Sequence, residues 1–276
     1  MGGVQKNSKM HFIIDCSDKR NEFLYEALCR DGYEVSRYSS QAAEYSESGE
    51  RYIFLFAPGT ELSFDAAAKI PIGSQVFCVR IDPKIAGEFA QKQIAVHLYF
   101  DDELLAMKNA YLTAEGALAV IIERTDRSIK DMRALVLGGG RVGKSVAKLL
   151  HDNRCFVCVA TIDPTEYAFS SIFSDVVYHF PDFEKHLSEF DLIVNTVPKI
   201  ILKGEKLERI KKDCFIIDLA SKPGGVDFAY AEKLGLTVVH ALGIPGKTAP
   251  RSAGLAIKDS VLSILLNKNS FSCKRT

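Results

Sequence analysis

The feature that most limits the possible folds is a regular alternation of short β-rich runs with amphipathic helical stretches. Strands are predicted at residues 11–15, 34–38, 52–57, 75–81, 94–99, 134–137, 156–160, 176–178, 192–195, 215–218 and 237–240. Helices are predicted between them at residues 21–30, 63–69, 84–92 and 142–151, and after them at 252–266. Strands separated by helices form right-handed βαβ units and a parallel sheet. The predicted fold class is therefore α/β.

The chain length of 276 residues favours two domains over one. Residues 1–108 are predicted to form an N-terminal α/β substrate domain, which the C-terminal helix at 252–276 completes. Residues 109–127 are predicted to form a long helical linker, and residues 128–251 a dinucleotide-binding domain. We expect two Rossmann-like parallel-sheet domains with a cleft between them.

The linker is predicted to follow a helix that opens with three acids, Asp101-Asp102-Glu103, where negative charge suits the helix dipole. Thr113 is expected to cap a second helix. Gly116 would weaken a helix interior, so we expect it near a helix start or at a close contact.

Charge and hydropathy disfavour several classes of protein. Lys and Arg total 35 and Asp and Glu total 35, so no basic excess is available to neutralise a nucleic-acid backbone. No apolar run approaches the ~20 residues that span a bilayer, so no membrane partner is expected. Residues 1–9 are polar, contain no apolar signal segment and are predicted to form a floppy leader, which favours a cytoplasmic protein.

The seven cysteines are odd in number and scattered along the chain, as is typical of reduced thiols in a cytosolic protein. Cys155 and Cys158 have C-x-x-C spacing, but they lie in a predicted strand, where positions i and i+3 face opposite sides. The two sulfurs are therefore not expected to share a disulfide or a metal ion, and no metal site is predicted.

Residues 138–145, Gly-Gly-Gly-Arg-Val-Gly-Lys-Ser, satisfy two phosphate-binding patterns. In the pattern G-x-G-x-x-G, Gly138, Gly140 and Gly143 make the turn, approach the pyrophosphate and pack the helix on the strand. In a P-loop, Lys144 would reach the β- and γ-phosphates and Ser145 a magnesium ion. Both patterns place an anion at a helix N-terminus. A tight turn without a ligand is a third interpretation.

The context of the loop favours the dinucleotide pattern. A predicted strand at 133–137 precedes it, and another at 156–160 follows at the tight spacing of a dinucleotide-binding βαβ unit. The P-loop alternative stays open, because the run Phe215-Ile-Ile-Asp218 could serve as a Walker B strand. A P-loop NTPase is thus the alternative from a different class.

The end of the second strand of this domain bears on the choice between NAD and NADP. An acid there binds the ribose 2′-hydroxyl of NAD, whereas an arginine nearby accommodates the 2′-phosphate of NADP. The sequence there is Ala160-Thr161-Ile162-Asp163. No acid stands at the strand tip, which favours NADP, although no arginine follows. NAD stays open, because Asp163 could still reach a ribose.

Several motifs cover roughly residues 109–266, more than half of the chain. They are Asn109-Ala-Tyr-Leu-Thr-Ala-Glu-Gly116, Leu137-Gly-Gly-Gly-Arg-Val-Gly143, Val194-Asn-Thr-Val-Pro198, Asp218-Leu-Ala-Ser-Lys-Pro-Gly-Gly-Val-Asp-Phe228, Tyr230-Ala-Glu-Lys233, Gly243-Ile-Pro-Gly246, Ala249-Pro250 and Ala253-Gly254. Together they resemble the A subunit of dipicolinate synthase. The Asp-Leu-Ala…Gly-Gly pattern is also similar to alanine dehydrogenases and nicotinamide transhydrogenases.

The resemblance implies an oxidoreductase that uses NADP or NAD to oxidise dihydrodipicolinate, or its hydrated precursor, to dipicolinate in spore formation. It implies a small dicarboxylate substrate, a flavoprotein partner (the B subunit of dipicolinate synthase) and a place in the cytoplasm of the mother cell. A homo-oligomer is also expected. A dehydrogenase of the alanine or 2-hydroxy-acid type is the nearest alternative, and a cofactor-binding protein without turnover of its own is another.

The candidate site residues lie at strand ends and in the motifs that carry the resemblance. The cofactor-binding candidates are Gly138, Gly140, Arg141, Val142, Gly143, Thr161, Thr196, Val197, Pro198, Ala220 and Ser221. The substrate-binding candidates are Thr113, Ser221, Lys222, Pro223, Gly224, Gly225, Arg251 and Arg20. The catalytic candidates are Glu115, a base whose pKa partial burial would raise, and Lys222, a cation for a substrate carboxylate. His97 and His240 are expected to pack, and Asp227 to cap a helix.

The sequence departs from the family pattern at two places. The family's Gly-Gly-Asp-x-Arg turn is replaced by Cys16-Ser-Asp-Lys-Arg20, which keeps Asp18 and Arg20 but neither glycine. Ile162 stands where the family has an arginine after the second strand, which weakens the case for NADP.

Overall fold

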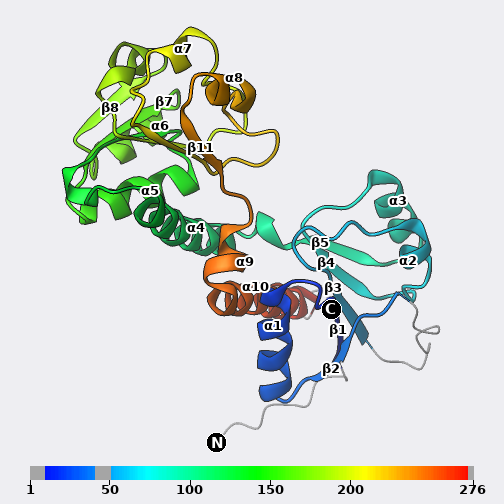
Figure 1. Ribbon diagram of the computed structural model, residues 1–276. Helices are drawn as coiled ribbons and strands as arrows, with labels where there is room; N and C mark the ends of the chain where they lie inside the picture. Colours follow the sequence, from blue (N-terminus) through cyan, green and yellow to red (C-terminus); the bar gives the residue numbers. More distant parts are fainter. Residues whose placement is uncertain (1–9, 41–50, 273–276) are drawn as a thin grey trace, which may run out of the picture. The chain divides into compact units, whose positions relative to one another are not determined.

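The computed structural model describes residues 10–40 and 51–272. The chain divides into two compact units, one formed by the described residues of Met1–Lys108 and Ala249–Thr276 and the other by Asn109–Thr248. Each unit contains a parallel sheet with helices packed on it (Figure 1), so the predicted α/β fold class is confirmed. Two predicted segments lie outside the described residues: the leader at 1–9 and the end of the C-terminal helix at 273–276.

The first unit contains a five-stranded sheet in the order β2-β1-β3-β4-β5. Its strands are β1 (Met10–Ile14), β2 (Glu34–Arg37), β3 (Arg51–Leu55), β4 (Gln75–Cys78) and β5 (Ala95–Leu98). The strands pair in parallel throughout this order. This is the order of flavodoxin-like doubly wound sheets. The sequence pattern predicted the strands but not their order.

The helices of the first unit cover both faces of its sheet. They are α1 (Lys19–Arg30), α2 (Phe64–Ala68), α3 (Pro83–Gln91) and α10 (Pro250–Ser272), with a 3-10 turn η1 (Tyr99–Asp101). On one face, Leu24 of α1 and Ile257 of α10 share a core with Phe12 of β1. Gly254 lets the two helices approach, because a Cβ there would lie 2.2 Å from the carbonyl oxygen of Arg20.

The second unit contains a six-stranded sheet in the order β11-β10-β9-β6-β7-β8. Its strands are β6 (Arg133–Leu137), β7 (Phe156–Thr161), β8 (Val176–His179), β9 (Leu192–Asn195), β10 (Phe215–Asp218) and β11 (Thr237–His240). Neighbouring strands are parallel. With β6 counted as the first strand, this is the order of Rossmann sheets, in which the chain reverses direction across the sheet between β6 and β9. Ligands bind at the carboxyl ends of the strands around that point.

The second sheet is buried on both faces. Its helices are α4 (Glu103–Arg124), α5 (Arg141–Asp152), α6 (Pro164–Ser170), α7 (Glu205–Glu208), α8 (Phe228–Lys233) and α9 (Ile244–Thr248), with 3-10 segments η2 (Ile129–Asp131) and η3 (Asp182–Glu189). Ala134 and Val136 of β6 share a core with α4 and α5, whereas Leu135 and Leu137 share one with η3 and α7. Because successive side chains face opposite sides, a strand covered twice is apolar throughout.

Residues 109–124, predicted as part of a separate linker, are the later part of the single helix α4 and belong to the second unit. The expectation that Thr113 caps a second helix is wrong: its hydroxyl donates to the carbonyl oxygen of Asn109 at 2.8 Å within the helix. Gly116 lies at a close contact, since a Cβ there would be 2.1 Å from Cγ2 of Ile244. By length and composition α4 could cross a membrane, but its inner face is part of the core of the second unit.

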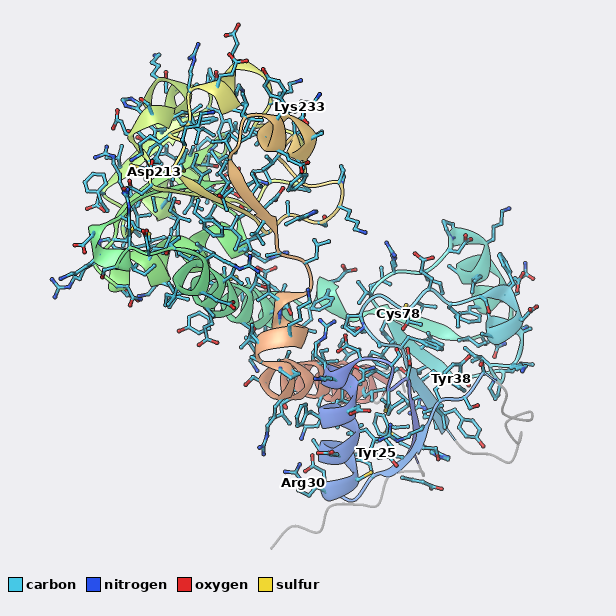
Figure 2. All side chains as sticks on the ribbon, viewed as in Figure 1. Tyr25, Arg30, Tyr38, Cys78, Asp213 and Lys233 are labelled. Carbon is cyan, nitrogen blue, oxygen red and sulfur yellow. The ribbon has the colours of Figure 1, made fainter. Side chains whose placement is uncertain are left out.

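Cys155 and Cys158 contribute to the cores on opposite faces of the second sheet, as their spacing predicted. Both are free thiols. In the first unit, Cys78 is buried at the end of β4 (Figure 2). Burial raises the pKa of the Cys155 thiol to about 12 and the pKa values of Cys158 and Cys78 to about 11. These thiols are therefore part of the cores.

Candidate cofactor site

The glycine loop connects β6 to α5 at the carboxyl edge of the second sheet. Gly138 has φ +96°, which L side chains rarely adopt, and Gly140 is the N-cap of α5. Gly143 packs the helix against the strand end, because a Cβ there would lie 2.0 Å from the carbonyl oxygen of Gly138. These are the places that the G-x-G-x-x-G pattern gives its glycines.

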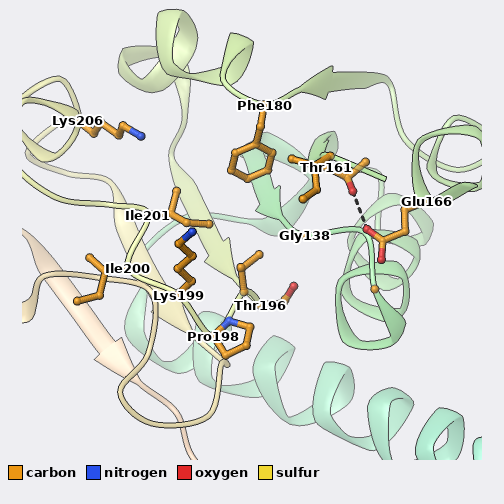
Figure 3. A pocket seen from close by; sticks show the side chains of 13 residues that line it. Gly138, Thr161, Glu166, Phe180, Thr196, Pro198, Lys199, Ile200, Ile201 and Lys206 are labelled. Carbon is orange, nitrogen blue, oxygen red and sulfur yellow. Dashed lines mark hydrogen bonds between the residues drawn. The ribbon is translucent and has the colours of Figure 1, made fainter. Parts of the chain in front are cut away.

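A cavity of about 490 Å³ lies beside this loop (Figure 3), a volume within the usual range of small-molecule sites. It is lined by Gly138, Gly140, Thr161, Ile162, Glu166, Phe180, Thr196, Val197, Pro198, Lys199, Ile200, Ile201 and Lys206. Most of these residues follow β6, β7, β8 or β9 directly. The cavity therefore occupies the crevice at the point where the strand order reverses.

The predicted cofactor residues fall into three groups. Those that line the cavity are Gly138, Gly140, Thr161, Thr196, Val197 and Pro198. Arg141, Val142 and Gly143 form the first turn of α5, and Ala220 and Ser221 follow β10. The hydroxyl of Thr196 donates to the carbonyl oxygen of Leu137 at 2.8 Å, which ties the loop after β9 to the end of β6.

Sequence reasoning missed Glu166. Its Oε2 accepts hydrogen bonds from the hydroxyl of Thr161 at 2.6 Å and from the backbone N–H of Gly139 at 3.1 Å. The signal was the pattern Asp-Pro-Thr-Glu at 163–166, which starts a helix with an acid at its third position. Asp163 caps α6 by accepting the N–H of Glu166 at 2.8 Å. The cap thus turns a carboxylate onto the glycine loop.

A buried polar pair shapes the loops after β9 and β10, and sequence reasoning missed it as well. The side-chain amide of Asn195 donates to Asp218 at 2.8 Å and to the carbonyl oxygen of Val197 at 3.0 Å. Asp218 also accepts the backbone N–H groups of Ala220 at 3.0 Å and Gly225 at 2.7 Å. The only sequence signal was that a polar residue, Asn195 in one case and Asp218 in the other, ends each of two apolar runs.

The geometry around Lys144 does not fit a P-loop. Its Nζ lies 4.8 Å from the centre of the Phe169 ring. Ser145 is buried and its hydroxyl donates to the carbonyl oxygen of Arg141 at 2.9 Å, a bond within the helix. Asp218, which ends the run that could serve as a Walker B strand in the P-loop alternative, is fully buried in the polar pair. Across residues 10–40 and 51–272, no group of three or more His, Cys, Asp or Glu side chains could hold a metal ion.

The predicted substrate residues after β10 differ in exposure. The exposed ones are Ser221, Lys222 and Pro223, and the buried ones are Gly224 and Gly225. Gly224 has φ +93°, and a Cβ there would lie 2.6 Å from Oδ2 of Asp218. A Cβ on Gly225 would lie 2.2 Å from Nδ2 of Asn195. The glycines thus make room for the buried polar pair, which supports the exposed turn that carries Lys222.

Arg20, predicted to bind a substrate carboxylate, is already paired within the first unit. It is buried, and its Nε and Nη2 donate to Asp18 at 2.8 and 2.7 Å. Burial acts to raise the pKa of Asp18, but these bonds outweigh it and hold the pKa below its ordinary 3.8. Arg251 is exposed near the start of α10, and Glu115 is exposed on α4, so within its own unit Glu115 lacks the burial expected for a base.

His240, His97 and Asp227 were expected to pack or to cap a helix, and each makes a contact of that kind. His240 lies with Nε2 2.9 Å from the carbonyl oxygen of Ala220. His97 is buried and lies with Nε2 2.9 Å from Oε1 of Gln75. Asp227 caps α8. None of the three lines the cavity beside the glycine loop.

Part of the sequence matches a dehydrogenase family model. The family model for shikimate / quinate 5-dehydrogenase matches residues 104–239. The A subunit of dipicolinate synthase from Bacillus subtilis (strain 168) is 35% identical over 167 residues, which is 60% of this chain. The chain is similar to the A subunit of dipicolinate synthase. The match spans 56% of the length of that relative, a little over half.

Solved structures extend the likeness in fold to almost the whole chain. The A chain of dipicolinate synthase from Bacillus subtilis has a TM-score of 0.80 at 24% identity and covers 98% of this chain and 99% of its own. A transhydrogenase from Sinorhizobium meliloti has a TM-score of 0.70 at 16% identity and covers 93% of each chain. At these identities the likeness establishes the fold alone, and that fold is of the dehydrogenase type.

Proposed function

We propose that this chain is an NAD(P)-dependent oxidoreductase that oxidises dihydrodipicolinate, or its hydrated precursor, to dipicolinate in spore formation. The observation that carries the proposal is the glycine loop, which follows the first strand of a Rossmann-ordered sheet and borders a cavity of about 490 Å³. The similarity to the A subunit of dipicolinate synthase supports the substrate.

The residues around the cavity fit a dinucleotide. Gly140 is the N-cap of α5, at the end of the helix where the dipole favours negative charge, and it has no side chain to obstruct a pyrophosphate. Thr196, Val197 and Pro198 would hold the nicotinamide half. Ile162, which is 78% exposed, offers apolar surface to the adenine.

The turn after β10 carries a positive charge that can pair with a carboxylate of the substrate. Lys222 is exposed there and would bind one carboxylate, with Ser221 as a hydrogen-bond donor. The buried pair Asn195 and Asp218 holds this turn in place. Because Arg20 is paired with Asp18, we assign no substrate carboxylate to it.

The proposed reaction removes one hydride and one proton from the ring of dihydrodipicolinate. Bound nicotinamide supplies the hydride acceptor. We assign the proton to Glu115, whose exposed carboxylate can pass it on to water. If the substrate is the hydrated precursor, one water molecule leaves before the oxidation. We also propose that the chain works with a flavoprotein partner, the B subunit of dipicolinate synthase.

The test supplies dihydrodipicolinate, or its hydrated precursor, to the purified chain with NAD⁺ or NADP⁺, in the absence and in the presence of the flavoprotein partner. Dipicolinate and reduced nicotinamide should form in equal amounts, and Lys222→Gln should raise KM for the dicarboxylate more than it lowers kcat. Product that forms only with the flavoprotein would indicate a cofactor-binding protein without turnover of its own. Turnover of alanine or a 2-hydroxy acid instead would contradict the proposed substrate.

A further inference from the structure

We propose that Glu166 is the acid that binds the adenosine ribose of the cofactor, and that it selects NAD(H) over NADP(H). The inference rests on the proposed nicotinamide site. In dinucleotide-binding sheets this acid usually stands near the end of the second strand, where it accepts the ribose 2′-hydroxyl. Here the strand β7 ends at Thr161 with no acid, and the helix after it supplies the carboxylate instead.

The carboxylate of Glu166 is held at the place that a ribose acid requires. Its Oε2 accepts the hydroxyl of Thr161, at the end of β7, and the backbone N–H of Gly139, in the glycine loop. Figure 3 shows the bond from Thr161 and the side chain of Glu166 at the edge of the cavity. Two bonds to one oxygen fix the carboxylate against the loop.

The second oxygen of Glu166 remains available to a ligand. Within the described part of the chain, both hydrogen bonds to this carboxylate end on Oε2. Oε1 lies beside the loop, since a Cβ built on Gly140 would be 3.6 Å from it. A ribose hydroxyl that donates to Oε1 would form a charge-assisted hydrogen bond.

The charges on the segment that follows β7 oppose a 2′-phosphate. No Lys or Arg occurs between Arg154 and Lys185, whereas Asp163 and Glu166 follow β7 directly. An arginine in this place is what accommodates the 2′-phosphate of NADP. A phosphate there would meet a fixed carboxylate and no neighbouring cation on this segment, and like charges disfavour each other.

The two lysines that line the cavity come from the other wall. Lys199 and Lys206 follow β9, and Figure 3 shows them across the cavity from Glu166. Lys206 already pairs with Glu184 at 2.6 Å. Neither lysine therefore offsets the charge of Glu166 at the end of β7. The end of β7 carries no acid, which favoured NADP. Glu166 of α6 supplies that acid instead.

The test measures the dissociation constants of NADH and NADPH by nicotinamide fluorescence, which no tryptophan obscures because the chain has none. The wild-type chain should bind NADH at least about tenfold more tightly, the effect of one hydrogen bond to a charged group. Added salt should reduce this ratio, because salt screens the repulsion. Glu166→Gln keeps the shape and an acceptor for Gly139 while removing the charge, and should bring the ratio to about one.

Glu123→Gln is the matched control, because it removes the same charge by the same substitution from an exposed position on α4 that does not line the cavity. It should keep the wild-type ratio within about twofold. Equal or tighter binding of NADPH by the wild-type chain would overturn the inference while leaving the proposed function intact, and this measurement needs no variant. Binding of neither NADH nor NADPH would overturn the proposed function itself.

Discussion

The side-chain amide of Asn195 donates a hydrogen bond to the carboxylate of Asp218 at 2.8 Å, and both side chains are fully buried at the ends of adjacent strands. Through this bond the carboxylate of Asp218 supports both the loop after β9 and the loop after β10. Val197, on the cavity side, is held through Asn195, and the turn that carries Lys222 is held through Asp218. The cofactor wall and the proposed substrate cation therefore share one buried support.

Asp218→Ala should destabilise the second unit strongly. It leaves the amide of Asn195 and the N–H groups of Ala220 and Gly225 without their acceptor, and each buried donor without a partner costs about 1–3 kcal/mol. We expect the free energy of unfolding in urea to fall by about 3 kcal/mol or more. Asp213→Ala is the control, because exposed Asp213 (Figure 2) pairs with Arg127 at the surface and its loss should cost about 1 kcal/mol or less. Equal losses in the two variants would contradict the role of Asp218.

Gly143→Ala should weaken nicotinamide binding strongly. The added Cβ would lie 2.0 Å from the carbonyl oxygen of Gly138, so either the loop or the start of α5 must move. We expect the dissociation constant for NADH to rise by about a hundredfold or more, because the close approach of the helix to the strand is lost. Gly87→Ala of α3 is the control, because its new methyl group meets nothing within 4 Å. This variant should keep its NADH affinity, and the alanine should stabilise the helix by up to about 1 kcal/mol. Undiminished binding by Gly143→Ala would contradict the assignment of the loop.

Asp15 should make the first unit sensitive to acid. Burial acts to raise its pKa, but hydrogen bonds from the Thr60 hydroxyl at 2.6 Å and the Ala57 N–H at 3.1 Å, together with those of Ser17, hold the pKa below its ordinary 3.8. Because the folded pKa is lower than the unfolded one, this stabilisation is present above pH 3.8 and is lost as the pH falls through the folded value. Asp15→Asn should flatten the dependence of stability on pH below about 4.

The matched control for this prediction is Asp65→Asn, which removes a charge from the exposed first turn of α2. It should retain the wild-type loss of stability in acid, as measured by urea unfolding at a series of pH values. A profile for Asp15→Asn that overlays the wild type would show that those hydrogen bonds do not stabilise the carboxylate.

The buried cysteines should resist thiol reagents in the native protein. Burial raises the pKa of Cys155 and Cys214 to about 12 and that of Cys78 and Cys158 to about 11, so their reactive thiolates are scarce. In a Cys273→Ser background, exposed Cys29 should react with DTNB fastest and these four only after urea is added. Modification of Cys155 and Cys158 in the folded chain, or a disulfide between them, would contradict their burial on opposite faces.

The predictable part of the fold was the alternation of strands and helices, because a strand covered on both faces must be apolar throughout. β9, β10 and β11 begin and end at the predicted residues. Strand order was not predictable, since neighbours in a parallel sheet are chosen by packing between segments far apart in the sequence. Thr113 failed as a cap because the surrounding apolar residues continue the helix through it, and its hydroxyl bonds back to Asn109.

The site was predictable where local backbone geometry determines the residue type. Gly138 and Gly143 could be assigned because a positive φ and a close approach exclude side chains. Glu166 and Asp218 could not, since their roles depend on contacts with Gly139 and Asn195, which lie 27 and 23 residues away. An acid in a helix and an acid at a strand end have many uses, and only the folded chain brings these two to the loops they hold.

A titration of the wild-type chain and of Lys144→Ala with NADH and with Mg-ATP decides whether the glycine loop binds a dinucleotide. Lys144 lies over the ring of Phe169, so its removal should change NADH affinity by less than about threefold. We expect saturable NADH binding by both proteins and no binding of Mg-ATP. Binding of Mg-ATP alone, lost in Lys144→Ala, would contradict the nicotinamide site and make the glycine loop a P-loop.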